Sequence, residues 1–496
     1  MSSVLHELFE GSEIFITGGT GCIGKAYLDK ILRAFNVKKV FILLREKRGK
    51  SVNVRLESFK NNVFFGPLRS QKPQELDKLQ AVKGDISLEG LGVSENDLHL
   101  MKNVSFVIHC AATINFTEPL RNAIALNIRG TRDTLEISRN FKDLKLFMYT
   151  STFYSNCNLQ LSEEKVHTPP MDWRAALKLL KYDVDTLNAL TPKIIGDFPN
   201  TYTFTKNIAE SIVNDYSHQI PTSIIRPAIV IASFFEPIPY YIDNYTATNG
   251  VSIAFSTGMV NFTILDKDRP LNNVRLDTTV FLTLLSVVPA VARFREGKSV
   301  YVLNISGFGL TAATVYDLFT QMKKSIELYP SEKCLFGVPE MNYVKSKNVF
   351  SFRFFFEAFL PVLILEKVLK FFKLASSKVS MASSLRLFFM SNMLYSFFVS
   401  SDYRGSNDNQ TYLIKEAHKY PGFQNLKEMF ADKDETLCVH YAKGIRRYIF
   451  KEDDSTIPKA RRRYKIIKAV STIFKYGFLL VFVYFVLRFI LRNVIQ

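Results

Sequence analysis

The sequence is poor in the residues that small secreted proteins use as covalent cross-links. It has five cysteines among 496 residues, and no two of them form a Cys-x-x-Cys pair. A low, odd cysteine count without that spacing is typical of a reducing compartment and argues against a disulfide framework. The seven histidines form no recognisable metal-binding constellation, and His109, at the end of an apolar stretch, is predicted to be structural.

Two further absences narrow the choice of partner. Residues 1–13 have no cationic start and no apolar run, so the sequence predicts no secretory signal peptide. The net charge of +18 would suit nucleic acid, but no zinc knuckle or ribonucleoprotein motif accompanies it, and nucleic acid is not expected as a partner. The basic charge therefore favours an anionic substrate and a membrane surface as partners. The sequence is compatible with both a monomer and a homo-oligomer.

A glycine-rich loop lies near the N-terminus, at residues 17–25. The apolar run at 13–17 predicts a buried strand, and 26–35 predicts a helix, so the glycines would form a strand-to-helix turn. In a dinucleotide site Gly18 would make the tight turn, Gly21 would let the backbone approach the pyrophosphate, and Gly24 would allow helix and sheet to pack closely. The flanking strand and helix favour this interpretation over an ordinary glycine-rich turn.

A second predicted strand, residues 40–44, ends at Arg45 rather than at an acidic residue. An acidic side chain there would bind the ribose 2′-hydroxyl of NADH, whereas Arg45, with Lys47 or Arg48, suits the 2′-phosphate of NADPH. NADPH is therefore the predicted cofactor, although a basic run after a strand is often only solvated surface. Further strands are predicted at 79–83, 104–110, 146–151 and 222–226, and their alternation with helical stretches predicts a doubly wound parallel sheet.

Tyr202 and Lys206 are four residues apart, a spacing that places both on one face of a helix. A neighbouring ammonium favours the phenolate, so Lys206 would lower the pKa of Tyr202 and make the phenol a better proton donor. Such a pair after a glycine loop indicates hydride-transfer chemistry, whereas the pair alone would more often be a solvated helix face.

Several segments resemble the extended short-chain dehydrogenase/reductases, and more narrowly the fatty acyl-CoA reductases of animals and plants. The most specific are Thr-Pro-Lys-Ile-Ile-Gly-Asp at 191–197 and Pro-Asn-Thr-Tyr-Thr-Phe-Thr-Lys at 199–206. The resemblance covers about the first 300 residues and continues more faintly to 440–448. The supporting segments are 17–25, 109–116, 127–131, 150–154 and 225–230.

The resemblance implies a role for each matching residue. Tyr202 would protonate the developing alkoxide, Lys206 would hold the nicotinamide ribose, and Thr152, with Ser151 as the alternative, would polarise the carbonyl. Asp85 matches a position that contacts adenine, Asn127 one that supports the active-site helix, and Arg226-Pro227 a turn at the nicotinamide. The cofactor-binding residues are expected to be Thr17, Gly18, Thr20, Gly21, Cys22, Ile23, Gly24, Arg45, Lys47, Arg48, Asp85, Ala111, Ala112, Asn127, Tyr202, Lys206, Arg226 and Pro227.

The function that the resemblance implies is NADPH-dependent reduction of a long-chain acyl-CoA to a primary alcohol through a bound aldehyde, supplying ether lipid or wax synthesis. Another membrane-associated member of the superfamily, a hydroxysteroid dehydrogenase or a sugar epimerase, is the first alternative, and a non-catalytic NADPH-binding scaffold is the second. The sequence departs from the family pattern on the expected substrate side, at Tyr240, Tyr241, Ala247, Thr248, Arg275 and Leu276.

The expected organisation is a Rossmann-type reductase domain with a substrate lobe at 1–300, a mostly helical domain at 305–450, a basic linker at 451–475 and a membrane anchor at 476–496. The stretch between Thr152 and Tyr202 is expected to cover the active site. Residues 349–373 carry charges and a proline, and they predict an interfacial or packed helix pair. A similar, shorter element is predicted at 387–399.

Residues 476–491 carry a charge only at Arg488, and they would cover about 24 Å of a ~30 Å hydrocarbon core. The basic cluster before them predicts that the catalytic domain faces the cytosol. The basic flank and the family together predict a tail-anchored protein of the peroxisomal membrane, with the endoplasmic reticulum as the alternative.

Overall fold

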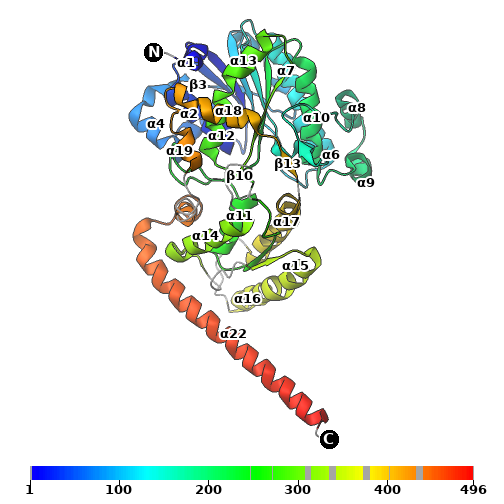
Figure 1. The fold of residues 1–496 in the computed structure, drawn as a ribbon, viewed down its shortest axis with the longest axis vertical. Helices are drawn as coiled ribbons and strands as arrows, with labels where there is room; N and C mark the ends of the chain where they lie inside the picture. The colour runs from blue at the N-terminus through cyan, green and yellow to red at the C-terminus, as the bar shows by residue number, and fades with distance from the viewer. Residues whose placement is uncertain are drawn as a thin grey trace. The chain divides into compact units, whose positions relative to one another are not determined.

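The computed structural model describes residues 3–245, 247–270, 272–307, 314–334, 342–372, 380–401, 403–431 and 440–494 (Figure 1). The chain forms two compact units, and each is assembled from separated segments. The first unit comprises Met1–Tyr241, Leu271–Ala312 and Ser401–Asp432. The second comprises Ile242–Pro270, Ala313–Ser400 and Lys433–Gln496.

The first unit is built on a seven-stranded sheet with the order β11-β7-β5-β4-β1-β2-β3, and each neighbouring pair is parallel. The order reverses between β1 and β4, which is where sheets of this type bind their ligands. The doubly wound sheet predicted from the sequence is thus confirmed, and only the edge strand β11 was not predicted. The strands are β1 Glu13–Thr17, β2 Lys39–Leu44, β3 Leu79–Lys83, β4 Val104–His109, β5 Leu146–Thr150, β7 Thr222–Pro227 and β11 Tyr301–Ile305.

Helices cover both faces of this sheet (Figure 1). On one side α2 (Cys22–Ala34) packs against α12 (Leu276–Leu285), and α13 (Val287–Arg295) contacts β5 and β7. On the other side α7 (Gly130–Arg139) packs against α10 (Thr201–Tyr216). In the predicted helix, the apolar residues Tyr27, Leu28, Ile31 and Leu32 are buried, but α2 begins at Cys22 instead of residue 26, because the glycine turn leads directly into its first turn.

The predicted boundary near residue 300 needs correction, because residues 401–432 belong to the first unit. Helix α18 (Asp408–Glu416) packs on β11 and α12, and β13 (Arg404–Gly405) pairs with β6 (Leu161–Ser162). The carboxylate of Glu164 joins the two parts by accepting the backbone N–H of Asn304 at 2.9 Å and that of Asn409 at 2.8 Å. These contacts are long-range, and no local sequence pattern signals them.

The second unit is mostly helical, as predicted. It holds α11 (Ala247–Ser256), α14 (Val315–Leu328), α17 (Met381–Ser400) and α21 (Tyr441–Gly444). Strands β9 (Phe262–Ile264) and β12 (Asn342–Val344) pair in parallel beside them. Helix α17 includes the predicted element at 387–399 and packs against α11 and α16.

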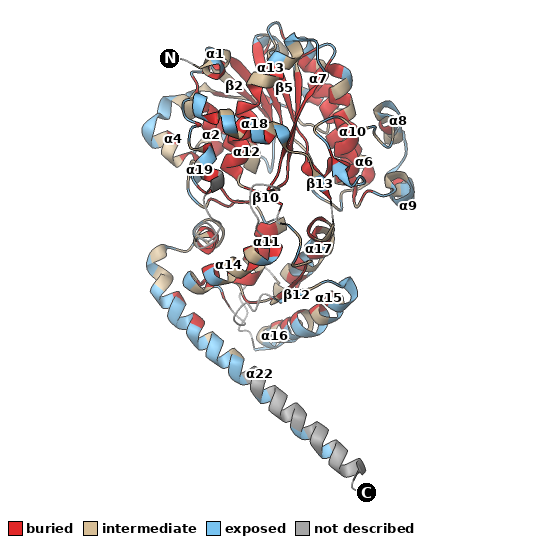
Figure 2. Cartoon of the chain, viewed as in Figure 1, coloured by how far each residue is buried: buried red, intermediate tan, exposed pale blue. Residues whose placement is uncertain are grey.

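Residues 347–371 form one continuous helical run rather than the predicted pair. It consists of α15 (Lys347–Arg353), the π-helix η7 (Phe354–Phe359) and α16 (Leu360–Phe371). Pro361 lies in the first turn of α16, directly after η7, and a π-turn changes the hydrogen-bonding register where proline has no N–H to give. The inner face is buried at Phe350, Phe354, Ala358, Val362 and Glu366, and the outer face exposes Phe352, Phe356 and Phe371 (Figure 2).

Two helical runs among the described residues are long and apolar enough to cross a membrane, namely Leu276–Arg295 and Lys347–Phe371. The first is 78% buried and is a core element of the sheet domain, whereas the second is 22% buried. The long helix α22 (Ile457–Val494) spans most of the predicted linker and anchor. Most side chains of the predicted anchor lie outside the described residues.

Candidate active site

The glycine loop forms a cradle that only residues without a side chain can build. Gly18 has a φ of +71°, and a Cβ atom there would lie 2.6 Å from the backbone nitrogen of Ala111. A Cβ on Gly24 would lie 2.3 Å from the carbonyl oxygen of Gly18. Gly21 is the N-cap of α2 and has no side chain to cap it, so the N–H groups of the first turn are available to an anion. Residues Thr17 to Gly24 therefore fit a dinucleotide pyrophosphate.

His109 links this loop to the opposite helix layer through a chain of hydrogen bonds. Thr131 donates its hydroxyl to the carbonyl of Asn127 at 2.7 Å, so it must accept at 3.1 Å from Nε2–H of His109. Nδ1 of His109 then accepts from the hydroxyl of Thr17 at 2.7 Å. Burial, and next the charge of Lys206, lower the pKa of His109 to about 3. The structural role predicted for His109 is confirmed.

Asn127 positions the helix that carries the tyrosine. Its Nδ2 donates to the hydroxyl of Thr205 on α10 at 2.9 Å, and its Oδ1 accepts from the backbone N–H of Thr113 at 3.0 Å. The asparagine thus joins α10 to the loop after β4. This is the supporting role that the family resemblance implied for it.

Thr152, Tyr202 and Lys206 come together beyond the carboxyl ends of β4 and β5. The hydroxyl of Thr152 lies near enough to the phenol of Tyr202 to oppose the rise in its pKa, and the ring of Phe116 lies 5.6 Å from the Tyr202 ring. The buried ammonium of Lys206 donates to the carbonyl oxygen of Thr150 at 2.6 Å and lies 4.6 Å from the centre of the Tyr149 ring. Burial lowers the pKa of Lys206 to about 8, against the opposing effects of Cys110 and Glu210.

The electrostatic effect predicted for Lys206 differs from what this structure shows. Burial raises the pKa of Tyr202 to about 12, and the neighbouring hydroxyl of Thr152 acts in the opposite direction. The reason is geometric, because the Lys206 ammonium points to the carbonyl of Thr150. In this arrangement Thr152, more than Lys206, favours the ionised phenol.

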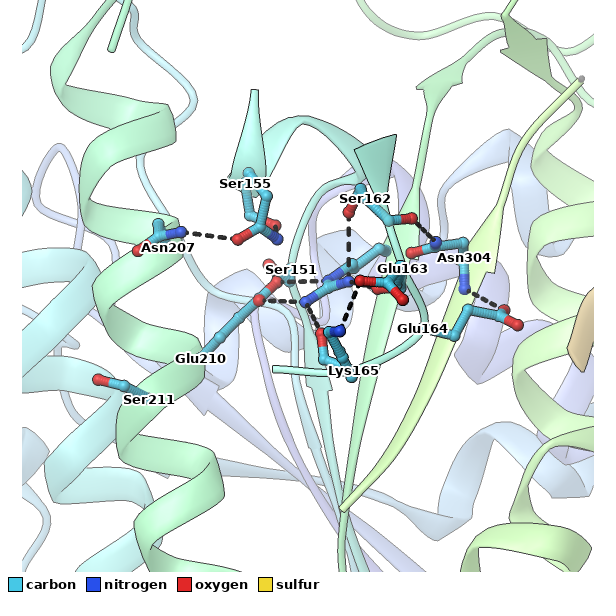
Figure 3. Close-up of polar contacts among 12 residues, drawn as sticks. Ser151, Ser155, Ser162, Glu163, Glu164, Lys165, Asn207, Glu210, Ser211 and Asn304 are labelled. Carbon is cyan, nitrogen blue, oxygen red and sulfur yellow. Dashed lines mark hydrogen bonds and ion pairs between the residues drawn. The ribbon is translucent and has the colours of Figure 1, made fainter. Parts of the chain in front are cut away.

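The choice between Ser151 and Thr152 follows from a buried network that the sequence analysis missed (Figure 3). The hydroxyl of Ser151 donates a hydrogen bond to the carboxylate of Glu210 at 2.5 Å. The same carboxylate accepts hydrogen bonds from Nε (2.9 Å) and Nη2 (2.6 Å) of Arg226. Ser151 therefore gives its proton to a structural partner, whereas the hydroxyl of Thr152 accepts from the backbone N–H of Tyr154 at 3.3 Å and keeps its proton for the site. A carboxylate eight residues after Tyr202 on the same helix was the available signal.

Arg226 does not lie in an open turn. It lies within strand β7, directly before the last residue Pro227, and has no exposed surface. It also donates to the carbonyl oxygens of Glu163 and Lys165, each at 2.8 Å. Its guanidinium ties α10 to the segment after β6 and has no group left for a cofactor. Only backbone atoms at Arg226 and Pro227 could meet a nicotinamide.

The predicted adenosine end of the site is exposed and basic. Arg45 pairs with Asp85 at 3.2 Å, and Asp85 also accepts from the backbone N–H of Ser87 at 2.9 Å and from its hydroxyl at 2.8 Å. Despite partial burial, these hydrogen bonds and Arg45 hold the pKa of Asp85 below its usual range. Lys47 and Arg48 lie in the exposed turn that follows. Two of the predicted groups therefore already contact each other.

Most of the departures from the family pattern have structural partners. Tyr241 accepts from the ammonium of Lys25 at 3.0 Å, and Arg275 binds the carbonyl oxygen of Met429. Asp277 accepts three backbone N–H groups of residues 234–236. Thr248 belongs to the second unit, where it is hydrogen-bonded to Tyr395.

Comparison with known proteins identifies the family of the chain. Residues 16–282 match the NAD-binding family described as male sterility protein. The chain is 30% identical over 478 residues to fatty acyl-CoA reductase wat of Drosophila melanogaster, covering 94% of this chain and 90% of that protein. It is 30% identical over 500 residues to fatty acyl-CoA reductase 1 of Xenopus laevis, covering 99% and 94%.

Solved structures share the fold. The terminal R domain from the myxalamid PKS-NRPS biosynthetic pathway superimposes with a TM-score of 0.58 at 16% identity, covering 89% of this chain and 92% of that one. The reductase domain of a non-ribosomal peptide synthetase from Mycobacterium tuberculosis gives a TM-score of 0.54 at 14% identity, covering 89% and 95%. The family match and the whole-chain relatives together show that this protein is an NAD(P)-dependent oxidoreductase of the fatty acyl-CoA reductase family.

Proposed function

We propose that this protein reduces a long-chain fatty acyl-CoA to a primary alcohol with NADPH, in two hydride transfers at one site. The observation that carries the proposal is the meeting of Thr152, Tyr202 and Lys206 beside a loop that fits a dinucleotide. The sequence holds one such loop and one such set of residues, so both reductions have to use the same groups.

When bound, the nicotinamide supplies the hydride. Thr152 donates a hydrogen bond to the thioester carbonyl, and Tyr202 gives its proton to the oxygen as the carbon accepts the hydride. The hydroxyl of the resulting hemithioacetal returns its proton to the Tyr202 phenolate as the C–S bond breaks, which releases CoA thiolate and leaves an aldehyde. After the oxidised cofactor is exchanged for a second NADPH, a second hydride and a proton from Tyr202 would convert the aldehyde to the alcohol, and the phenolate takes its proton back from solvent. Lys206, whose pKa burial lowers to about 8, would hold the nicotinamide ribose, as the family resemblance implies.

The test is to measure NADPH consumption by the purified full chain with a panel of acyl-CoAs and to identify the lipid product. Fatty aldehyde supplied with NADPH should give the alcohol without acyl-CoA. Lys206→Ala should depress both half-reactions. An enzyme that stops at aldehyde, or a Lys206 variant that loses one half-reaction only, would contradict a shared site.

The preference for NADPH is part of the proposal and rests on Arg45, with Lys47 and Arg48. We expect Arg45→Asp to raise KM for NADPH far more than KM for NADH, because the guanidinium pairs with the 2′-phosphate in a charge-assisted contact. Lys50→Asp, an exposed charge reversal in the same turn, is the matched control and should change the two KM values equally. An equal effect of Arg45→Asp on both cofactors would show that the turn is only surface.

The proposed location is a membrane, with the catalytic unit facing the cytosol. The exposed phenylalanines of 347–371 and the basic residues 459–468 support contact with an anionic lipid surface. The peroxisomal membrane is the first choice and the endoplasmic reticulum the second. The alcohol product would then supply ether lipid or wax synthesis.

A further inference from the structure

Helices α11 and α17 of the second unit enclose an apolar cavity of about 300 Å³. Its wall includes Val251, Ala254, Val260, Leu385 and Phe388, and none of its lining residues carries a charge. The volume is at the lower end of the range for small-molecule sites in proteins. One rim residue, Leu387, is 68% exposed, so the cavity opens beside an apolar surface.

One polar side chain in this wall has a hydrogen-bonding group without an acceptor. Asn392 is 1% exposed, and its Oδ1 accepts from the hydroxyl of Thr263 at 2.7 Å and from the backbone N–H of Ile264 at 3.1 Å. A backbone N–H can only donate, so the orientation of the amide is fixed. Its Nδ2 then finds no acceptor among the described residues.

A buried donor without an acceptor is rare in folded proteins and marks a place where a missing partner would be stabilised. The nearby hydroxyls of Thr248 and Tyr395 are already hydrogen-bonded to each other at 2.6 Å. The cavity therefore matches a ligand that is apolar along its length and has one acceptor oxygen. That oxygen has to be neutral, because burying a carboxylate or phosphate with no cation in the wall is strongly unfavourable.

We infer that this cavity binds one long-chain primary alcohol, with the alkyl chain against α11 and α17 and the hydroxyl oxygen accepting from Nδ2 of Asn392. The lining belongs entirely to the second unit, whereas Thr152, Tyr202 and Lys206 belong to the first. The inference goes beyond the proposed function, since it assigns a binding site that needs no turnover.

The experiment uses the full chain in phosphatidylcholine nanodiscs with a photoreactive, diazirine-bearing hexadecanol. Mass spectrometry of the crosslinked protein should place the label on peptides from α11 and α17. Ser391→Phe fills the cavity from its wall and should reduce labelling about tenfold or more. Ser383→Phe is the matched control, because Ser383 is an exposed serine on the same helix that does not line the cavity.

A second variant tests the hydrogen bond. Asn392→Leu removes the donor at similar side-chain volume, so labelling should fall about tenfold, whereas Thr263→Val loses the Thr263–Asn392 hydrogen bond, keeps the donor and should retain labelling. Unlabelled hexadecanol should compete, and palmitate should not. Label on other elements, labelling unaffected by Ser391→Phe, or equal competition by palmitate would overturn the inference. A protein that failed to reduce acyl-CoA would still give this readout, so the two proposals fail separately.

Discussion

Tyr202 supplies the proton in the proposed reaction, and its replacement by Phe removes the hydroxyl and little else. We therefore expect Tyr202→Phe to leave nicotinamide cofactor binding nearly unchanged and to reduce turnover by about 10²- to 10⁴-fold. Steady-state kinetics and cofactor titration of the purified variant measure the two quantities. A Tyr202→Phe enzyme with the wild-type rate would show that another group donates the proton.

Thr152 and Ser151 are adjacent but have different partners, so substitutions at the two positions should have different effects on turnover and stability. Thr152→Val removes the hydroxyl that faces Tyr202 and should reduce turnover with little change in thermal stability. Ser151→Ala removes a hydrogen bond to Glu210 and should reduce stability by about 1–3 kcal/mol with turnover retained. If Ser151→Ala abolished turnover and Thr152→Val did not, the assignment of the two hydroxyls would have to be exchanged.

His109 should make stability depend on pH. Its pKa is about 3 when folded, against an ordinary value near 6.5, so between these values the unfolded chain binds a proton that the native state does not. Its contribution to stability is complete above about pH 6.5 and is lost at about 1.4 kcal/mol per pH unit as the pH falls. Denaturant unfolding of wild type and His109→Gln between pH 7 and 5 should show a flatter profile for the variant. Parallel profiles would mean that the pKa of His109 is the same in the native and the unfolded state.

The glycine loop and the Tyr202–Lys206 pair could be predicted from strand position and helical spacing, whereas Thr152 and Asn127 were predicted only through the family resemblance. The sequence could not predict the direction of the Lys206 ammonium or the burial of Arg226. Both depend on contacts across the fold, with Thr150 O in the first case and Glu210 in the second. The sequence shows which side chains can donate or accept hydrogen bonds, and tertiary packing decides which partner each of them contacts.

At the scale of elements, the tight junction of β1 and α2 makes Gly24 the most sensitive position of the loop. A Cβ there would overlap the carbonyl oxygen of Gly18, which belongs to the backbone and cannot rotate away. We expect Gly24→Ala to weaken cofactor binding and stability together. Gly66→Ala, at the start of helix α4 (Gly66–Gln71) with open space around it, should be neutral or stabilise by up to about 1 kcal/mol.

Cofactor titration and thermal unfolding of both glycine variants provide the comparison. Unchanged cofactor affinity in Gly24→Ala would mean that the loop can open without loss of binding.

The helical run at 347–371 shows a limit of element prediction. Its charges and Pro361 suggested two helices, but the charged side chains have partners close by. Glu366 accepts from the hydroxyl of Ser380 at 2.9 Å and from the backbone N–H of Ala382 at 3.1 Å, so it caps the start of α17. A buried charge that caps a neighbouring helix cannot be distinguished from a helix-breaking charge in one sequence.

At the scale of the whole molecule, the parallel sheet was predictable because most of its strands follow one another with local signals. The division into two units was not, because the chain enters the second unit at residue 242 and returns twice. Only the strap at 401–432 and its contacts with β11 reveal that return. Composition alone made the region after residue 300 look like one helical domain.

Membrane association tests the whole chain. Deleting residues 475–496 should release the protein only in part, because the outer face of 347–371 still presents Phe352, Phe356 and Phe371 to lipid. Replacing these three exposed residues by Ser in the truncated protein should complete the release, whereas the same replacements in the full chain should not. Fractionation with high salt and with carbonate measures this. Complete solubility after truncation alone would show that the tail is the sole membrane contact.

The strap at 401–432 also sets the order of events during synthesis. Strands β1 to β7 leave the ribosome early, yet the first unit lacks β11 and α18 until the intervening segments of the second unit have been made. Strand β11 ends 78 residues after β7, from Pro227 to Ile305, so at about 5–20 residues per second the β7 edge stays unpaired for roughly 4 to 16 seconds. An unpaired parallel edge is a template for aggregation, so this interval is when the polypeptide most needs a chaperone.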